Sequence, residues 1–225
     1  MNDRFAELKR AFAEQLYDLR MFKDKTRSPD GKGFRLKLHQ SKPDAPLSPF
    51  YIDLRVLRSY PQTAKRTARM LFEFMLNGLG AEVLADVPTA ITPIVSSVSD
   101  RTGIPMITPR PAKDHGAGGN IDGVWSVDGA TAVLFDDLVT EAHSKIEAAT
   151  VLLNAGITVK DVVVLVDREQ GGRKQLEAVG LTLHTAFTIT ELLALYRDTG
   201  KISQHLYGEI ARYLEQQATV RKAAG

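Results

Sequence analysis

Residues 131–145 read TAVLFDDLVTEAHSK, and this stretch decides the fold. Its first part, TAVLF, is a short apolar run typical of a buried strand. The paired acids Asp136 and Asp137 end that run, and the hydroxyls of Thr140 and Ser144 stand at the entry to the next helix. In an open parallel sheet, ligands bind at the carboxyl ends of the strands, so this segment predicts both an α/β fold and the place of its site.

Apolar runs and helical patterns alternate on both sides of this segment. The strand candidates are EVLADV at 82–87, IPMIT at 104–108 and DVVVLV at 161–166, with helical patterns near 93–101 and 143–154. Short apolar runs separated by helices indicate parallel strands that are covered on both faces. We therefore predict an α/β protein with a doubly wound, mostly parallel sheet.

The N-terminal part of the chain does not share this alternation. Apolar residues at three- and four-residue steps predict a helix over residues 2–22, and an alternating pattern predicts a strand at 34–38. A proline-rich loop follows, and FYIDLRV at 50–56 is rich in strand-forming residues. Together these elements predict a small N-terminal hood.

The rest of the chain begins and ends with helical patterns. Ser59 as a helix N-cap and Pro61 in the first turn mark a helix whose buried face runs from Ala64 to Leu76 and which ends before Gly78. An apolar stripe predicts a terminal helix over 201–217. We accordingly divide the chain into an N-terminal helix and hood at 1–60, a core at 61–200 and a C-terminal helix at 201–225.

The composition is that of an ordinary globular protein. The 225 residues are 44% hydrophobic and 25% charged, which argues against disorder and fibrous repeats. Lys and Arg number 29 against 27 Asp and Glu, a balance that calls for neither nucleic acid nor an acidic membrane as partner. The lack of cysteine excludes disulfides, thiolate zinc sites and cysteine nucleophiles. With no signal-like start and no apolar run of about 20 residues, we expect a soluble cytoplasmic protein.

The residues around the acid pair suit a phosphorylated sugar. Backbone N–H groups at the start of the predicted helix favour a phosphate, and the hydroxyls of Thr140 and Ser144 add donors. The carboxylates of Asp136 and Asp137 can accept hydrogen bonds from the vicinal hydroxyls of a ribose. The histidines away from this segment lack the short spacings of a transition-metal site, so we predict no metal ligands among them.

This segment resembles the signature of the phosphoribosyltransferases, in which an apolar strand, two acids and two apolar residues precede a turn that holds the 5-phosphate of phosphoribosyl pyrophosphate. The resemblance implies that Asp136 and Asp137 hold the ribose hydroxyls and take part in catalysis. It assigns the phosphate turn to Thr140, Ala142, His143 and Ser144.

The segment 109–123, PRPAKDHGAGGNIDG, is expected to be a long loop because it has no apolar period. Its AKDHG motif resembles the mobile catalytic loop of orotate phosphoribosyltransferases. That resemblance makes Lys113 and His115 catalytic groups that close over the leaving pyrophosphate, with Arg110 as a further contact. Cations that arrive with closure of the loop stabilise the charge that builds up in the transition state. The resemblance also implies a homodimer in which loop residues reach across the interface.

Three further segments resemble the orotate side of that family. DVVVLVDREQGG places Arg168 where an arginine contacts the orotate carboxylate, although a surface pair with Asp167 is the alternative. SPFYIDLR and FRLK suggest Tyr51 and Lys37 as further orotate contacts, with Thr140 completing the set, while an outward lysine on a strand is the alternative for Lys37. The resemblance implies transfer of the phosphoribosyl group to orotate, with Mg²⁺ bound through diphosphate and ribose oxygens.

Some residues depart from the family pattern. Glu141 and His143 stand in the phosphate turn where small residues are usual, so Glu141 must point away, pair with a cation or repel the phosphate. Ala90 replaces a lysine of some members in the pyrophosphate-contacting turn DVPTAITP, and Pro109 replaces a basic residue of the loop. These departures motivate the alternative of a non-catalytic ligand sensor. A phosphoribosyltransferase for another base is a further hypothesis.

Overall fold

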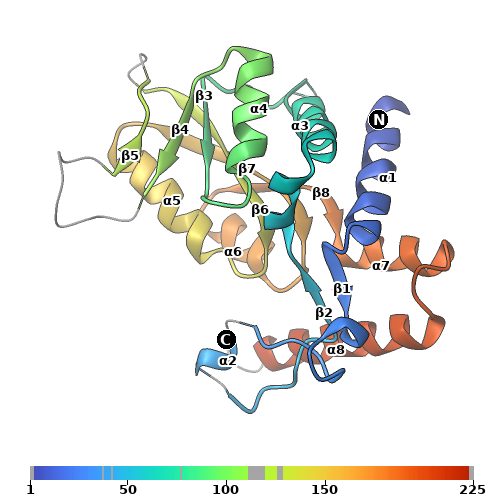
Figure 1. Ribbon diagram of the computed structural model, residues 1–225. Coiled ribbons are helices and arrows are strands. Elements are labelled where there is room, and N and C mark those ends of the chain that lie inside the picture. The colour runs from blue at the N-terminus through green and yellow to red at the C-terminus, as the bar shows by residue number, and fades with distance from the viewer. Residues whose placement is uncertain are drawn as a thin grey trace.

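The structure, a computed structural model, describes residues 3–36, 38–41, 43–76, 78–110, 120–125 and 129–222. Within these ranges the main sheet has six strands in the order β5-β4-β3-β6-β7-β8 (Figure 1). Strands β3, β4, β6, β7 and β8 run parallel to one another, and the edge strand β5 is antiparallel to β4. The bounds are β3 Val83–Asp86, β4 Met106–Pro109, β5 Ile121–Asp122, β6 Thr131–Val139, β7 Thr158–Asp167 and β8 Thr182–Thr188. The predicted mostly parallel sheet is confirmed, with β5 as an edge strand inside the segment expected to be loop.

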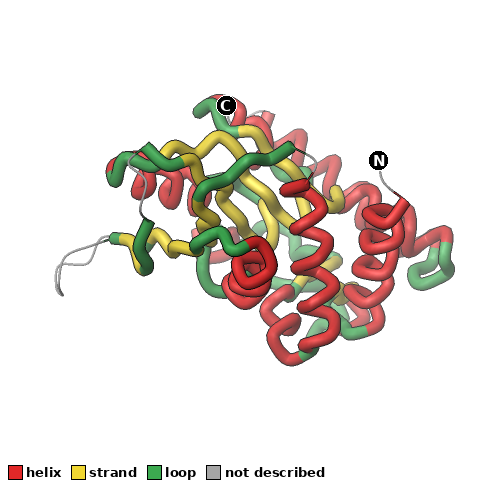
Figure 2. The backbone as a smooth tube through the Cα atoms, turned by 90° about the horizontal axis from the view of Figure 1, so that it is seen from above, coloured by secondary structure: helices red, strands yellow, loops and turns green. Residues whose placement is uncertain are grey.

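Helices cover both faces of this sheet (Figure 2). Buried side chains of one face, such as Phe135, pack in one cluster with α1 Asp3–Asp18, α3 Pro61–Leu76, α4 Thr92–Thr102 and α7 Ile189–Asp198. Buried side chains of the other face, such as Leu134, pack in a second cluster with α5 His143–Asn154 and α6 Gly172–Ala178. Neighbouring residues of one strand enter different cores, so both must be apolar. This explains why the apolar runs in the sequence are continuous.

The hood is built around a two-stranded antiparallel ribbon of β1 Phe22–Asp24 and β2 Phe50–Ile52. It also contains the 3₁₀ helices η1 Lys25–Arg27 and η2 Leu54–Ser59 and the short helix α2 Leu38–Ser41. The terminal helix α8 Gln204–Lys222 lies beside this ribbon in Figure 1, where Lys25 Nζ approaches Glu209 Oε2 at 2.6 Å. Segments from the two ends of the chain therefore meet in the hood.

Three predictions for the hood were wrong. The first helix ends at Asp18 because Arg20 takes a left-handed conformation with φ 59°, which turns the chain into β1. The strand predicted at 34–38 is reduced to a single bridge at Phe34, since the Leu36 N–H donates to His39 Nδ1 at 2.8 Å and bends the chain. The strand predicted at 50–56 stops at Ile52 and continues as η2.

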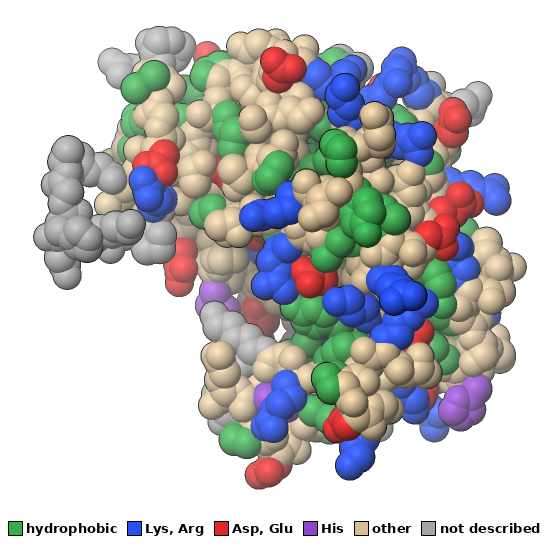
Figure 3. Space-filling model, in the orientation of Figure 1, with side chains coloured by type: hydrophobic (Ala, Val, Ile, Leu, Met, Phe, Trp, Pro, Cys, Tyr) green, Lys and Arg blue, Asp and Glu red, His purple; other side chains and the backbone are tan. Residues whose placement is uncertain are grey.

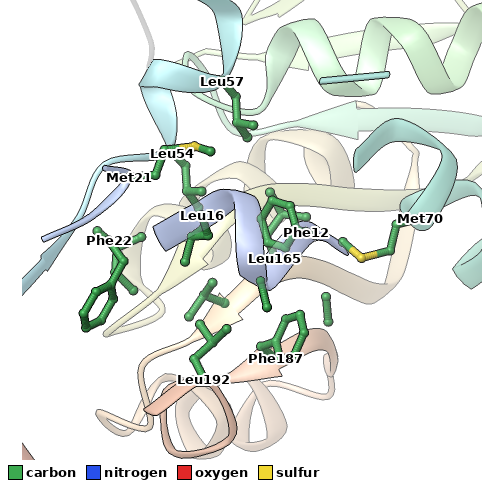
Figure 4. Packing of buried hydrophobic residues seen from close by; sticks show 14 of the residues in the cluster. Phe12, Leu16, Met21, Phe22, Leu54, Leu57, Met70, Leu165, Phe187 and Leu192 are labelled. Atoms are coloured by element: carbon green, nitrogen blue, oxygen red, sulfur yellow. The ribbon is translucent and has the colours of Figure 1, made fainter. Parts of the chain in front are cut away.

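Helix α1 packs in the main core, in the same cluster as buried residues of the hood. Its residues Phe12 and Leu16 are buried beside Leu165 of the sheet and Leu192 of α7 (Figure 4). The hydroxyl of Tyr196 donates to the carbonyl of Ala13 at 2.8 Å, which ties α7 to α1. Among the helices that the structure describes, none combines the length and apolar character needed to cross a bilayer.

Candidate active site

The paired acids lie inside β6, which runs on to Val139 instead of ending at them as predicted. The two side chains leave the strand on opposite faces, but their carboxylates stay close enough for the charge of Asp137 and a hydrogen bond with it to act on Asp136. Asp136 points to the α5 side, where its Oδ2 lies 2.5 Å from Lys145 Nζ. Asp137 is half-buried and lies within electrostatic range of Arg55 in η2. The acid that remains toward the hood is therefore Asp137.

Asp136 and Lys145 form a buried ion pair. Their side chains are 8% and 5% exposed. Burial raises the pKa of the Asp136 carboxyl, the Lys145 ammonium opposes this, and the nearby charge of Asp137 adds to it. The sequence predictions did not include Lys145, although a lysine in the first turn of a helix that follows a strand-end acid is a signal that could have found it.

The turn between β6 and α5, residues 140–142, is the predicted phosphate turn. Among the described residues, the non-glycine positive φ angles are at Arg20 and Glu169, outside this turn. Ala142 has a φ of −90°, so the loss of the usual glycine causes no backbone strain here. Its N–H donates to Gln175 Oε1 at 2.7 Å, which means that one amide of the turn already has a partner.

The two unusual side chains of the turn face each other. Glu141 Oε2 lies 3.5 Å from His143 Nδ1, and both side chains are exposed. Of the three possibilities for Glu141, the structure favours pairing with a cation when His143 is protonated. Ser144 is exposed and lies 3.4 Å from Lys145 Nζ through its Oγ, at the start of α5.

Helix α6 supports this turn from behind. The Gly172 N–H donates to the Thr140 carbonyl at 2.9 Å. A Cβ atom added to Gly172 would lie 2.3 Å from Val139 Cγ2 and 2.9 Å from the same carbonyl oxygen, so the close approach requires glycine. Neither Gly172 nor Gln175 was among the predicted site residues. The paired glycines of REQGG were their visible signal.

The neighbouring residues Phe50 and Tyr51 of the hood strand β2 point in different directions. Phe50 is fully buried, and the guanidinium of the predicted orotate residue Arg168 lies 4.7 Å from the centre of its ring. Tyr51 points the other way and is half-buried, with its hydroxyl 3.0 Å from Arg55 Nη2. Asp53 accepts from Arg55 Nε at 2.8 Å. The hydrogen bond and charge of Asp53 raise the pKa of Arg55, to which Tyr51 and Asp137 add.

The remaining predicted residues lie at or beyond the edge of the described site. Arg110 is exposed and hydrogen-bonded to Asp122 of β5, at the base of the loop. Lys37, Lys113 and His115 lie outside the described residues. Figure 3 shows a hollow between the hood and the main body, with lysine and arginine side chains gathered beside it.

The described residues contain no cluster of three or more histidine, aspartate or glutamate side chains that would by itself hold a metal ion. Asp136 is buried in an ion pair with Lys145, so Asp137 is the acid with the better access to a bound ion. This donor set fits Mg²⁺, which keeps several waters and takes few protein ligands when phosphates supply the others.

The order of the sheet, the acid pair within β6 and the turn before α5 define a phosphoribosyltransferase fold with a hood. Comparison with known proteins narrows this class. Orotate phosphoribosyltransferase of Pyrobaculum islandicum is 33% identical over 171 residues, which cover 75% of this chain and 86% of that protein. The chain belongs to the orotate phosphoribosyltransferase family, as its sequence motifs predict.

Longer relatives also match. Uridine 5'-monophosphate synthase of Bos taurus is 35% identical over 175 residues, covering 77% of this chain and 36% of the bovine protein. The structure of UMP synthase of Leishmania donovani has a TM-score of 0.76 at 29% identity, covering 92% of this chain and 42% of that chain. The chain thus spans well under half the length of either synthase. No family model matches the chain.

Proposed function

We propose that this protein transfers the phosphoribosyl group of phosphoribosyl pyrophosphate to orotate, giving orotidine 5'-phosphate and pyrophosphate. The observation that carries the proposal is the arrangement at the end of β6, where Asp137 precedes the turn before α5 and lies within electrostatic range of Arg55, which is hydrogen-bonded to Tyr51 of the hood. A phosphate at the helix start and a ribose at the acid would place the anomeric carbon beneath the hood.

The reaction needs no protein nucleophile. The bond between the anomeric carbon and the pyrophosphate oxygen breaks, and the pyrophosphate leaves with that electron pair. An orotate ring nitrogen forms the new bond to the carbon and gives up its proton to the released pyrophosphate or to water. Asp137 holds the ribose hydroxyls, and Thr140 and Ser144 hold the 5-phosphate together with turn amides. Arg168 binds the orotate carboxylate, with Tyr51 and Lys37 beside the ring. Catalysis then rests on positioning and on stabilising charge.

The resemblance to the family adds three loop residues and a metal ion to the proposal. Lys113, His115 and Arg110 neutralise the charge that develops on the leaving pyrophosphate. Asp137 would be the carboxylate of the acid pair to hold Mg²⁺, which would supply further positive charge to the diphosphate. We also propose a homodimer in which the loop of one subunit serves the site of the other, and a cytoplasmic location.

The direct test is to mix the purified protein with orotate, phosphoribosyl pyrophosphate and Mg²⁺ and to follow the loss of orotate absorbance. Turnover that Lys113→Ala lowers by at least about a hundredfold supports the enzyme, because a charge interaction made in the transition state is lost. Arg10→Ala is a matched control, since this exposed arginine pairs with Glu14 on the surface of α1. Turnover by the control should be unchanged.

The alternative of a ligand sensor has one observation in its favour, the Lys145 ammonium that neutralises Asp136. Tight binding of phosphoribosyl pyrophosphate without turnover, measured by calorimetry, would support it. Turnover with another carboxylated base and not with orotate would point to a different phosphoribosyltransferase. Sedimentation analysis tests the homodimer, and a monomer at assay concentration would contradict the shared site.

A further inference from the structure

Asp86 is a buried carboxylate that the proposed reaction does not use. It is the last residue of β3 and is 0% exposed. Its Oδ2 accepts a hydrogen bond from the hydroxyl of Thr92, and its Oδ1 accepts one from the hydroxyl of Thr108. The two partners come from different elements, because Thr92 begins α4 and Thr108 lies in β4. One carboxylate therefore joins three segments.

The segment between Asp86 and Thr92, residues 87–91, leaves the sheet at the edge where ligands bind. The Val87 N–H donates to the carbonyl of Phe135, the residue before Asp136, at 2.8 Å. The turn is thus anchored directly beside the acids of β6. The charge of Asp136 is close enough to act on the carboxyl of Asp86.

Burying a carboxyl at the end of β3 costs free energy that an apolar residue would not cost. Burial raises the pKa of Asp86, and the hydrogen bonds from Thr108 and Thr92 oppose this without cancelling it. The neighbouring Asp136 adds to the cost of holding a second charge here. An apolar residue would fill the end of a parallel strand without these penalties, so a function for the carboxyl is the better explanation.

The geometry points to Asp86 as a positioning residue that holds the turn 87–91 in the shape that receives the diphosphate of the donor substrate. The turn is held at its far side by Arg58, whose Nη2 donates to the carbonyl of Thr89 at 2.9 Å. With the ends fixed by Asp86 and the middle fixed by Arg58, the backbone amides of the turn keep one orientation. This inference rests on the proposed function, which supplies the diphosphate.

The test compares Asp86→Ala with Asp86→Asn. Alanine removes both hydrogen bonds, and we expect the KM for phosphoribosyl pyrophosphate to rise about tenfold while the KM for orotate changes less than about twofold. Asparagine can accept from one threonine hydroxyl and donate to the other, so it should recover most of the affinity. Isothermal titration of each protein with pyrophosphate in the presence of Mg²⁺ should rank the dissociation constants of wild type, Asp86→Asn and Asp86→Ala in the same order as their KM values.

Variants that remove only one of the two hydrogen bonds keep the test usable if Asp86→Ala does not fold. Thr92→Val and Thr108→Val should each raise the same KM by roughly threefold, since each removes one hydrogen bond of the pair. Thr102→Val is the matched control, because its hydroxyl donates to the Val98 carbonyl at the opposite end of α4. That control should leave the KM unchanged.

Two results would overturn the inference. One is a fall in kcat and in unfolding temperature with an unchanged KM for the donor, which would mean that Asp86 only supports the core. The other is an Asp86→Asn variant as weak as Asp86→Ala. If the wild-type protein makes no product, the proposed function fails, while the ratio of pyrophosphate dissociation constants between the variants still decides the role of Asp86.

Discussion

The Nζ atom of Lys145 lies 2.5 Å from Oδ2 of Asp136, with both side chains almost fully removed from solvent. A strand residue and a helix residue thereby neutralise each other directly behind the proposed ribose site. Breaking such a pair by removing one partner leaves a buried charge, whereas removing both partners leaves none. The acid pair of this protein is thus asymmetric, with one carboxylate used inside the fold and the other left toward the substrate.

Lys145→Met should destabilise the protein in a manner that depends on pH. Burial raises the pKa of Asp136, so the folded state holds this proton more tightly than the unfolded state, and the free energy of unfolding falls as pH rises above the unfolded pKa. Without Lys145 the raised pKa climbs further. We expect a loss of about 3–5 kcal/mol at pH 9 and a much smaller loss at pH 5, measured by urea unfolding.

The double variant Lys145→Met with Asp136→Asn is the control for this prediction. It carries neither charge, so its stability should exceed that of the single variant at pH 9 and should not show the same fall with pH. A single variant that loses equal stability at both pH values would mean that lost packing of the lysine stem, rather than the ion pair, is responsible.

Gly172→Ala should disturb the phosphate turn. Its new Cβ would meet Val139 Cγ2 and the Thr140 carbonyl, so the start of α6 and the turn must move apart at a cost of roughly 1–3 kcal/mol. We expect the KM for phosphoribosyl pyrophosphate to rise about tenfold, because small displacements of binding groups are costly. Steady-state kinetics and thermal unfolding measure the two effects.

Gly180→Ala separates this close contact from backbone strain. Gly180 has a φ of +78° and nothing within 4 Å of the added Cβ, so its substitution costs stability through strain alone. Its KM for the donor should stay at the wild-type value. Equal KM values for the two variants would remove the support for a role of α6 behind the turn.

The main sheet could be predicted because its signals are local and strong. The helix expected between Ser59 and Gly78 corresponds to α3, which begins at Pro61, and the one expected near 143–154 coincides with α5. The hood could not be predicted in the same detail. β1 and β2 have three residues each and exist because they pair with one another, while the imidazole of His39 decides the shape of the next segment. Such contacts leave no periodic pattern.

The candidate site could be proposed from the sequence as residue types and places, and the roles of these residues stay predictions. Motifs named Asp137, Thr140 and Arg168 as candidates. The partners of these residues depend on distant parts of the chain. Gln175 reaches the turn from α6, and Lys145 becomes a partner of Asp136 because α5 packs on the end of β6. Local signals in the sequence could mark these residues as candidates, but only the packing of α5 and α6 identifies their partners.

Glu141→Gln should strengthen binding of the donor moderately. The exposed carboxylate of Glu141 borders the phosphate turn, and a like charge at about 4 Å costs about 1 kcal/mol in water, which corresponds to a few-fold change in affinity. We expect the KM for phosphoribosyl pyrophosphate to fall about two- to fivefold at low salt. At high salt the difference should shrink because exposed charges are screened.

His143→Gln supplies the comparison for Glu141. It removes the group that lies 3.5 Å from the Glu141 carboxylate, so the KM for the donor should rise instead of falling. Identical KM values for wild type, Glu141→Gln and His143→Gln at low salt would show that the turn binds phosphate without sensing these side chains.

Arg168→Lys should weaken orotate binding selectively. The buried Arg168 guanidinium lies over the Phe50 ring, which fixes the plane of its donors beneath the hood. Lysine keeps the charge but cannot offer two parallel N–H donors to a carboxylate or stack as a plane. We expect the KM for orotate to rise roughly 10- to 100-fold and the KM for phosphoribosyl pyrophosphate to change less than about twofold.

Arg173→Lys is the matched control for Arg168→Lys. Arg173 lies in α6, where it donates to the Leu183 carbonyl at 2.9 Å and pairs with Asp167 at 3.3 Å, away from the hood. This variant should keep both KM values and lose some stability. If Arg168→Lys raises the KM of both substrates equally, or if Arg173→Lys reproduces its effect on orotate, then Arg168 supports the fold of the β7 end and does not bind the base.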